Sequence, residues 1–269
     1  MKRAWILALS ATALFAADRI TPLYDEPAAA PLIGGWGYSA FVEYHGKRIL
    51  FDAGGSADAL AKNAKALGID LSKLDAVAIS HDDPDHYAGL EAVFAANPGV
   101  KVYVPDSESG AFSTSVMTHV LRFIQGALPG QHIVDPPARA NYVRVRDAAG
   151  ILPGVRLIVL PFDNGNRREQ AMLLDVPGGA VMLTGCGHPG VADFAKRAGA
   201  PVRLAAGGFH LQTSSEPDIR RTVQAFKQAG IESVSPGHCT GRFATQELRG
   251  VYGPRCEIVA VGGTIPLPK

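Results

Sequence analysis

The strongest chemical signal in the sequence is the segment His81-Asp82-Asp83-Pro84-Asp85-His86, in which five of six residues are of types that bind metal ions. Three carboxylates and two imidazoles this close together are unfavourable unless a positive charge lies among them, and a divalent cation supplies that charge. An apolar run at 75–80 precedes the segment and is typical of a buried strand. This context disfavours a solvated acidic loop and predicts a metal site at the end of a strand.

The same arrangement occurs at four other places, where an apolar run ends in a turn of small residues that carries His, Asp or Cys. These turns are 52–55, 185–188, 207–210 and 236–239. The strand ends of a rigid sheet are where α/β enzymes place reactive groups, and small residues leave room for a ligand. The turns are therefore candidates for the same site.

Runs of strand length alternate with helical segments along the chain, which favours an α/β architecture. Strands are expected at 39–44, 47–51, 75–80, 100–104, 155–160, 171–176, 180–184, 202–206 and 231–235. Helices are expected at 57–67, 87–96, 189–198, 215–230 and 242–249, and Ser215 with an acid three positions on is the expected cap of the fourth. Residues 106–140, with one further helix expected at 117–125, form an irregular insertion typical of a substrate-covering loop.

The first residues resemble a secretory signal peptide. Met1-Lys2-Arg3 is basic, and 4–17 is apolar and rich in alanine but too short to span a bilayer comfortably. We therefore expect residues 1–17 to direct export to the periplasm and 18–269 to form one domain. The alternative is that the segment is a buried first strand or helix of a cytoplasmic protein.

The composition indicates an ordinary globular protein, with 47% hydrophobic residues and a net charge of +1. This charge does not favour nucleic acid or an anionic membrane surface as a partner. Three cysteines are too few for a disulfide scaffold. The sequence also lacks a Gly-x-Ser-x-Gly elbow and a Gly-rich nucleotide-binding loop of the required spacing. We expect a small-molecule substrate and no stable membrane span in the mature chain.

The order of the motifs resembles the metallo-β-lactamase superfamily. Phe51-Asp52-Ala53-Gly54 is similar to its LFDTG-like strand end, and 80–90 is similar to its HxHxDH signature. The segments at 185–190, 207–211 and 236–241 resemble a branch that includes archaeal dihydropterin ribofuranosylaminobenzene phosphate synthase and uncharacterised metal-dependent hydrolases. The resemblance covers roughly 20–262 and implies a four-layer αββα sandwich with one or two metal ions at one edge.

The resemblance also implies a role for individual residues. The first metal would be held by His81, Asp83 and His188. The second would be held by Asp85, His86 and His238. Cys186 stands where many relatives have an aspartate that contacts both metals.

Two carboxylates and one further histidine complete the predicted site. Asp52 would orient a ligand or a water molecule, and either Asp85 or Asp52 could carry a proton during the reaction. His210 follows a strand and two glycines and is expected to line the substrate pocket.

Asp83 departs from the superfamily pattern, which has histidine at this position. A carboxylate is a harder ligand than an imidazole and favours iron or manganese, whereas the Cys186 thiolate favours zinc. We expect one or two divalent ions, with zinc as the first choice and iron or manganese as alternatives. In an exported protein, a Cys186–Cys239 disulfide is a further alternative that would remove Cys186 as a ligand.

A hydrolase is the function that this site favours, because a divalent metal lowers the pKa of its bound water to about 7. The substrate would be an ester, lactone, amide or phosphoester. Three alternatives stay open: a transferase like the pterin synthase branch, a diiron redox protein suggested by Asp83, and a metal-binding protein without turnover.

Overall fold

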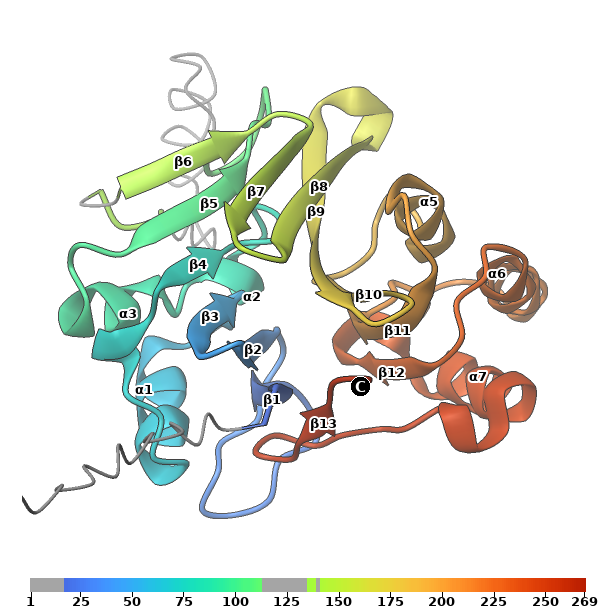
Figure 1. Ribbon diagram of the computed structural model, residues 1–269, viewed down its shortest axis with the longest axis horizontal. Coiled ribbons are helices and arrows are strands. Elements are labelled where there is room, and N and C mark those ends of the chain that lie inside the picture. The colour runs from blue at the N-terminus through green and yellow to red at the C-terminus, as the bar shows by residue number, and fades with distance from the viewer. Residues whose placement is uncertain (1–16, 113–134, 139–140) are drawn as a thin grey trace, which may run out of the picture.

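The computed structural model describes residues 17–112, 135–138 and 141–269, which form two mixed β-sheets packed face to face between two layers of helices (Figure 1). The expected four-layer αββα sandwich is therefore confirmed. The predicted signal segment and the helix expected at 117–125 lie outside the described residues, apart from Ala17. Within the described ranges, no helix combines the length and apolar character that crossing a membrane requires.

The first sheet has the strand order β13-β1-β2-β3-β4-β5-β6. Its strands are β1 (Arg19–Tyr24), β2 (Ser39–Tyr44), β3 (Lys47–Phe51), β4 (Ala76–Ala78), β5 (Lys101–Pro105), β6 (Asn141–Val145) and β13 (Ile265–Pro266). From β3 to β6 the neighbouring strands are parallel, so β3 and β4 end at the same edge of the sheet.

The second sheet has the strand order β12-β11-β10-β9-β8-β7. Its strands are β7 (Ala148–Leu152), β8 (Val155–Phe162), β9 (Arg167–Val176), β10 (Gly179–Thr184), β11 (Val202–Gly208) and β12 (Val234–Gly237). Because β10, β11 and β12 are parallel, the turns that follow them also lie at one edge.

Helices cover the outer face of each sheet (Figure 1). The helices are α1 (Ala57–Ala66), α2 (Pro84–Tyr87), α3 (Leu90–Ala96), α5 (Val191–Arg197), α6 (Glu216–Gln228) and α7 (Arg242–Tyr252). Four 3₁₀ turns complete the described elements: η1 (Leu71–Lys73), η2 (Asp163–Gly165), η3 (His238–Thr240) and η4 (Gly253–Arg255). In α6 the expected cap is present, since Ser215 accepts a hydrogen bond from the Asp218 amide.

Three apolar clusters hold the four layers together. The inner cluster lies between the two sheets and includes Phe51 and Leu183. One outer cluster packs α1 and α3 on the first sheet, and the other packs α5, α6 and α7 on the second sheet. Each helix thus buries one apolar face, as the spacing of Ile219, Val223 and Phe226 in α6 illustrates.

Several local expectations differ from the structure. The strands β6, β7 and β13 were not expected, and the strand expected at 231–235 lies at Val234–Gly237. The helix expected at 87–96 is divided into α2 and α3, and its first turn begins earlier, at Pro84. The division lies at Gly89, whose backbone packs directly against the carbonyl of Ala53. The strand β1 was not expected, because Pro22 and a bulge between Pro22 and Tyr24 disturb the alternating pattern.

The close approach at Gly89 gives a stability test. A Cβ atom there would lie 1.9 Å from the Ala53 carbonyl oxygen, so Gly89→Ala forces the backbone apart. We expect the free energy of unfolding to fall by about 1–3 kcal/mol, measured by urea denaturation. Gly250 is a matched control inside α7, where a Cβ atom meets no other atom within 4 Å.

Gly250→Ala should raise the free energy of unfolding by roughly 0.5–1 kcal/mol, because alanine loses less conformational entropy than glycine in a helix. Equal effects of the two substitutions would show that the contact between Gly89 and Ala53 does not matter for stability.

Candidate metal centre

The reactive groups predicted from the sequence meet where the two sheets present their strand ends. Asp52 follows β3 and His81 lies two residues beyond Ile79, which follows β4. The turn 185–188 follows β10, and His210 and His238 follow β11 and β12. Side chains that are far apart in the sequence thus form one cluster, because parallel strands bring their ends to the same edge.

The residues predicted for the second metal point their donor atoms at one another. The Nε2 atoms of His86 and His238 are 3.2 Å apart. Asp85 Oδ2 lies 3.6 Å from the first and 3.4 Å from the second, and Cys186 Sγ lies 3.4 Å from His86 Nε2. Ligands about 2.0–2.1 Å from a tetrahedral ion are about 3.3 Å apart. This donor set therefore fits a divalent metal ion.

The residues predicted for the first metal form a neighbouring group. His81 Nε2 lies 3.1 Å from Asp83 Oδ2, and the His81 and His188 rings have centroids 4.7 Å apart. The donor atoms of His81, His188 and Cys186 all lie within 4.8 Å of one another. Cys186 belongs to both groups, so its thiol lies between them.

Buried partners fix the Nδ1 atom of three of these histidines. His86 Nδ1 is 2.7 Å from Asp52 Oδ2 and His81 Nδ1 is 2.8 Å from Ser80 Oγ. His188 Nδ1 is 2.9 Å from Glu169 Oε2. A histidine that holds a metal usually bonds a carboxylate or similar group through its other nitrogen, which fixes the tautomer and the ring orientation. The arrangement therefore leaves the Nε2 lone pairs available for a metal.

Asp52 lies behind His86 and has no exposed surface. Its carboxylate accepts hydrogen bonds from the Ser80 amide at 2.6 Å and the Ser80 hydroxyl at 2.7 Å, besides the contact with His86. With both oxygens engaged, Asp52 can orient His86 but has no direct access to a substrate.

Glu169 is a fully buried carboxylate that the sequence reasoning missed. It accepts hydrogen bonds from the backbone amides of Cys186, Gly187 and His188 at 3.0, 2.7 and 2.8 Å. Burial alone would raise the Glu169 pKa, but the His188 hydrogen bond and the charges of His81 and His188 outweigh it and hold that pKa well below its usual range. Glu169 thus fixes the whole turn 185–188. The available signal was an acidic residue two positions before the apolar run 171–174.

Arg167 is a second missed residue. Its Nε donates to Asp82 Oδ1 at 2.8 Å, and its Nη2 donates to both Asp82 and Asp83. Asp82 also accepts from the Ala111 amide, so each of its two oxygens has a partner that anchors the loop. Burial would raise the Asp83 pKa, but hydrogen bonds and charge from His81 and Arg167 outweigh it and keep the carboxylate ionised.

His238 is held by the loop between β1 and β2. Its backbone amide donates to both oxygens of Asp25, at 2.9 and 3.1 Å, and its φ of 44° is in the left-handed region. Burial raises the pKa of Asp25 to about 6. Trp36 in the same loop is 51% exposed, with its ring centroid 4.7 Å from that of His238. The loop therefore forms one wall of the centre.

His210 and Cys239 form a third donor group together with Cys186. The three donor atoms are within 4.8 Å of one another. All three cysteines are free thiols, so the alternative of a Cys186–Cys239 disulfide is not present. The hydrogen bonds from Cys186 and His210 outweigh burial, which raises the pKa of the Cys239 thiol, and lower this pKa below its usual range.

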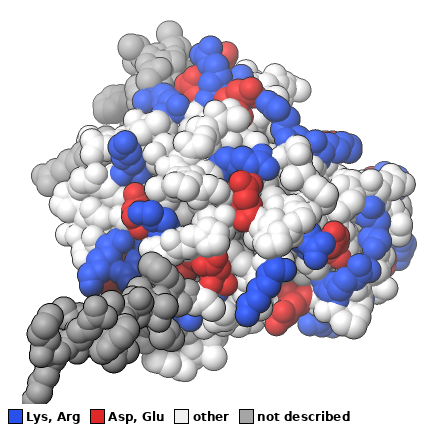
Figure 2. Space-filling model, in the orientation of Figure 1, with Lys and Arg blue, Asp and Glu red and all other residues white. Residues whose placement is uncertain are grey.

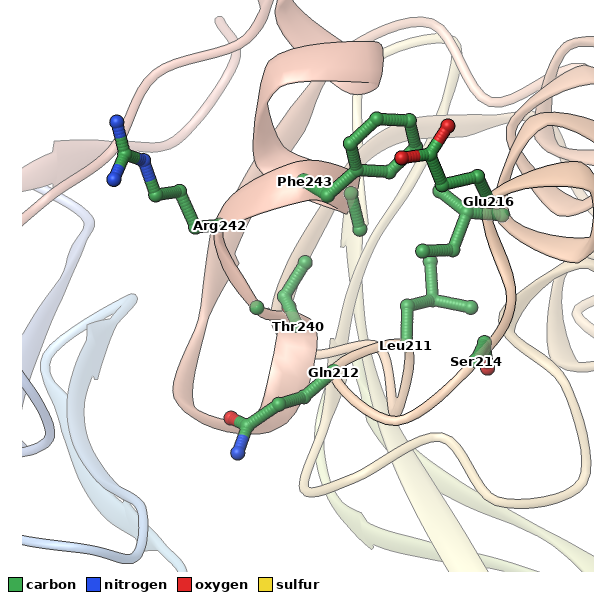
Figure 3. A pocket seen from close by; sticks show the side chains of 10 residues that line it. Leu211, Gln212, Ser214, Glu216, Thr240, Arg242 and Phe243 are labelled. Carbon is green, nitrogen blue, oxygen red and sulfur yellow. The ribbon is translucent and has the colours of Figure 1, made fainter.

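A small pocket of about 120 Å³ lies beside the centre (Figure 3). Its lining includes Leu211 and Thr240, the residues that follow His210 and Cys239, together with Phe243. Figure 3 shows Phe243 at the pocket and the Arg242 guanidinium pointing away from it. The lining contains none of the predicted metal ligands, so this pocket is a neighbour of the centre.

On the face of the molecule drawn in Figure 2, basic and acidic side chains are interspersed.

Two relatives from Methanocaldococcus jannaschii match much of the chain. One is 7,8-dihydropterin-6-methyl-4-(β-D-ribofuranosyl)-aminobenzene-5′-phosphate synthase, 25% identical over 226 residues, which cover 72% of this chain and 76% of that protein. The other is an uncharacterised protein, 25% identical over 270 residues, which cover 89% of this chain and 98% of the relative.

The fold is also similar to that of solved structures. A metal-dependent hydrolase of the β-lactamase superfamily superposes with a TM-score of 0.68 at 24% identity, covering 94% of this chain and all of the other. The family model of the metallo-β-lactamase superfamily matches residues 34–207. The chain therefore belongs to the metallo-β-lactamase superfamily.

Proposed function

We propose that this protein is a metal-dependent hydrolase that cleaves an ester, lactone, amide or phosphoester bond in a small molecule. The observation that carries the proposal is the convergence of His81, His86 and His188, each with its Nδ1 atom fixed by a buried partner. Membership in the superfamily supports it as well. When bound, a divalent ion lowers the pKa of a water molecule and polarises the substrate oxygen.

Individual residues of the chain would hold the metal ions and accept the proton. His86 and His238, with Asp85, would hold one ion, and His81, His188 and Asp83 would hold another. Asp85 is the proposed proton acceptor, because its side chain is 22% exposed and lies against two imidazoles. Burial would raise the Asp85 pKa, but the His238 hydrogen bond and the charge of His86 outweigh it, which keeps the carboxylate ionised.

A transferase is the second candidate, because one relative is named as a synthase. A hydrolase consumes water, whereas a transferase needs a second organic substrate to form product. Product analysis in the presence and absence of an added acceptor nucleophile therefore distinguishes the two.

We further propose that 18–269 is one catalytic domain and that 1–17 is removed on export.

The first test joins metal content to hydrolysis. Wild-type protein purified without chelator should contain one or two equivalents of a divalent metal by elemental analysis. It should also hydrolyse at least one member of a panel of nitrophenyl esters, lactones, amides and phosphoesters. His86→Ala removes an Nε2 donor, so it should lose metal and at least about 100-fold of the rate.

His45→Ala is the matched control, because His45 is an exposed turn residue whose side chain is 69% accessible. It should keep both metal and rate. Wild-type protein without metal, or a His86→Ala variant with full metal content, would contradict the proposal.

The choice of metal gives a second test. Asp83→His replaces a hard carboxylate with an imidazole, so the fraction of zinc should rise at the expense of iron and manganese when equal amounts are offered. Elemental analysis after dialysis against the mixture measures the ratio. Asp58→His is the matched control, since Asp58 is an exposed carboxylate that forms an ion pair with Lys62 on α1. An unchanged ratio in Asp83→His would mean that this carboxylate does not choose the metal.

Glu169 gives a third test of how the site is built. Glu169→Gln keeps the size of the side chain but removes the charge that orients His188 and one of its acceptor oxygens. Loss of such a partner typically weakens metal binding about 10–100-fold. Competition with a chromogenic chelator measures the affinity for Zn²⁺. Glu43→Gln, which weakens a partly buried ion pair with Arg19 on the strands β1 and β2, should bind like wild type. Wild-type affinity in Glu169→Gln would rule out this positioning role.

A further inference from the structure

Two thiols and an imidazole form a second cluster of soft donors next to the candidate metal centre. Cys186, His210 and Cys239 bring their donor atoms within 4.8 Å of one another. Cys239 Sγ accepts a hydrogen bond from the His210 amide at 3.3 Å and donates to the Cys186 carbonyl at 3.7 Å. The proposed hydrolysis uses neither His210 nor Cys239, so these two residues have no role in the function proposed above.

The backbone around the cluster is closely fitted. The carbonyl of Cys239 accepts hydrogen bonds from the amides of Leu211 and Gln212, both at 3.1 Å. Thr240 Oγ1 accepts from the Phe209 amide at 3.2 Å. These contacts join the turn after β11 to the turn after β12. The positions of His210 and Cys239 relative to each other are therefore fixed by the fold.

The backbone of Gly208 packs closely against both cysteines. A Cβ atom at this position would lie 2.9 Å from Cys239 Sγ and 3.2 Å from Cys186 Cα. His210 has a φ of 46°, in the left-handed region that a residue with a side chain rarely adopts. Such backbone conformations persist where the surrounding structure holds them, and they are common at ligand sites.

Burial and access differ within the cluster. Cys186 and Cys239 are 5% and 3% exposed, whereas His210 is exposed to solvent. The His210 ring also lies 4.2 Å, between centroids, from that of His188. An ion can thus reach the two thiols from the side of His210, and once bound it is shielded by the protein.

We propose that Cys186, His210 and Cys239 bind one thiophilic metal ion, of the Zn²⁺, Cd²⁺ or Cu⁺ class, in addition to the ions of the histidine and carboxylate groups. Thiolates select these metals over iron and manganese. The Cys186 thiolate would join this ion to the one held by His86 and His238. Three protein donors leave a fourth position for a water molecule or a small thiol.

Cadmium titration of the full chain, reduced and freed of metal, tests the proposal. Sulfur-to-cadmium charge transfer absorbs in the ultraviolet and counts the thiolates bound. We expect wild type to bind one ion with two thiolates. Cys239→Ala should lose about half of the charge-transfer intensity, and His210→Ala should bind Cd²⁺ at least about 10-fold more weakly. Cys256→Ala is the matched control, since Cys256 is a buried thiol outside the cluster and should change neither quantity.

A second measurement needs no variant. The ¹¹³Cd resonance of the wild-type protein should include one signal typical of a site with two sulfur donors and a nitrogen. Signals typical of nitrogen and oxygen donors alone would overturn the proposal, as would a Cys239→Ala variant that titrates like wild type. A thiol count of one in protein purified without reductant would also overturn it, because Cys186 and Cys239 would then form a disulfide.

The zinc content of Cys239→Ala distinguishes failure of the thiol site from failure of the proposed hydrolase function. If the variant keeps the metal of the histidine centre and its hydrolytic rate, the thiol site is independent of the proposed function. If His86→Ala loses its metal while the thiolate signal persists, the histidine centre has failed and the thiol site stands.

Discussion

The buried contact between Asp52 and His86 is the interaction on which the rest of the centre depends. A carboxylate with no exposed surface is costly unless every oxygen has a partner. Asp52 meets this condition with the amide and hydroxyl of Ser80 and with His86 Nδ1. The same three contacts fix the end of β3 to the loop that follows β4. A buried carboxylate that is unfavourable by itself thereby sets the direction of the segment 81–86.

The second sheet is joined to this point through Ser80 and Gln170. The Gln170 amide donates to the Ser80 carbonyl at 2.7 Å, and its side chain donates to the carbonyls of Ile79 and Tyr103. A Cβ atom at Gly185 would lie 1.9 Å from Ser80 Oγ, so the turn after β10 also packs against Ser80. Residues from both sheets can therefore reach one centre because glycine and a buried amide allow their backbones to approach closely.

The sequence predicted the parts of this arrangement that leave a local pattern. An apolar run followed by small residues identified the turns that carry Cys186, His188 and His238, and the strands at 39–44 and 47–51 have the bounds that were expected. Whether these residues bind metal stays a prediction. The partners Asp25, Arg167 and Glu169 could not be assigned, because their contacts depend on sheet order. Arg167 and Asp82, for example, are 85 positions apart in the chain.

The two metal groups differ in how firmly the protein already holds their carboxylates. Asp83 gives one oxygen to Arg167 and the other faces His81, so an ion in the first group must share this ligand with a guanidinium. Within the described part of the chain, Asp85 has ion-pair contacts only with His86 and His238. Because Arg167 already neutralises part of the charge on Asp83, we expect the second group to bind its ion more strongly than the first. Unequal occupancy of the centre would then follow from the position of one arginine.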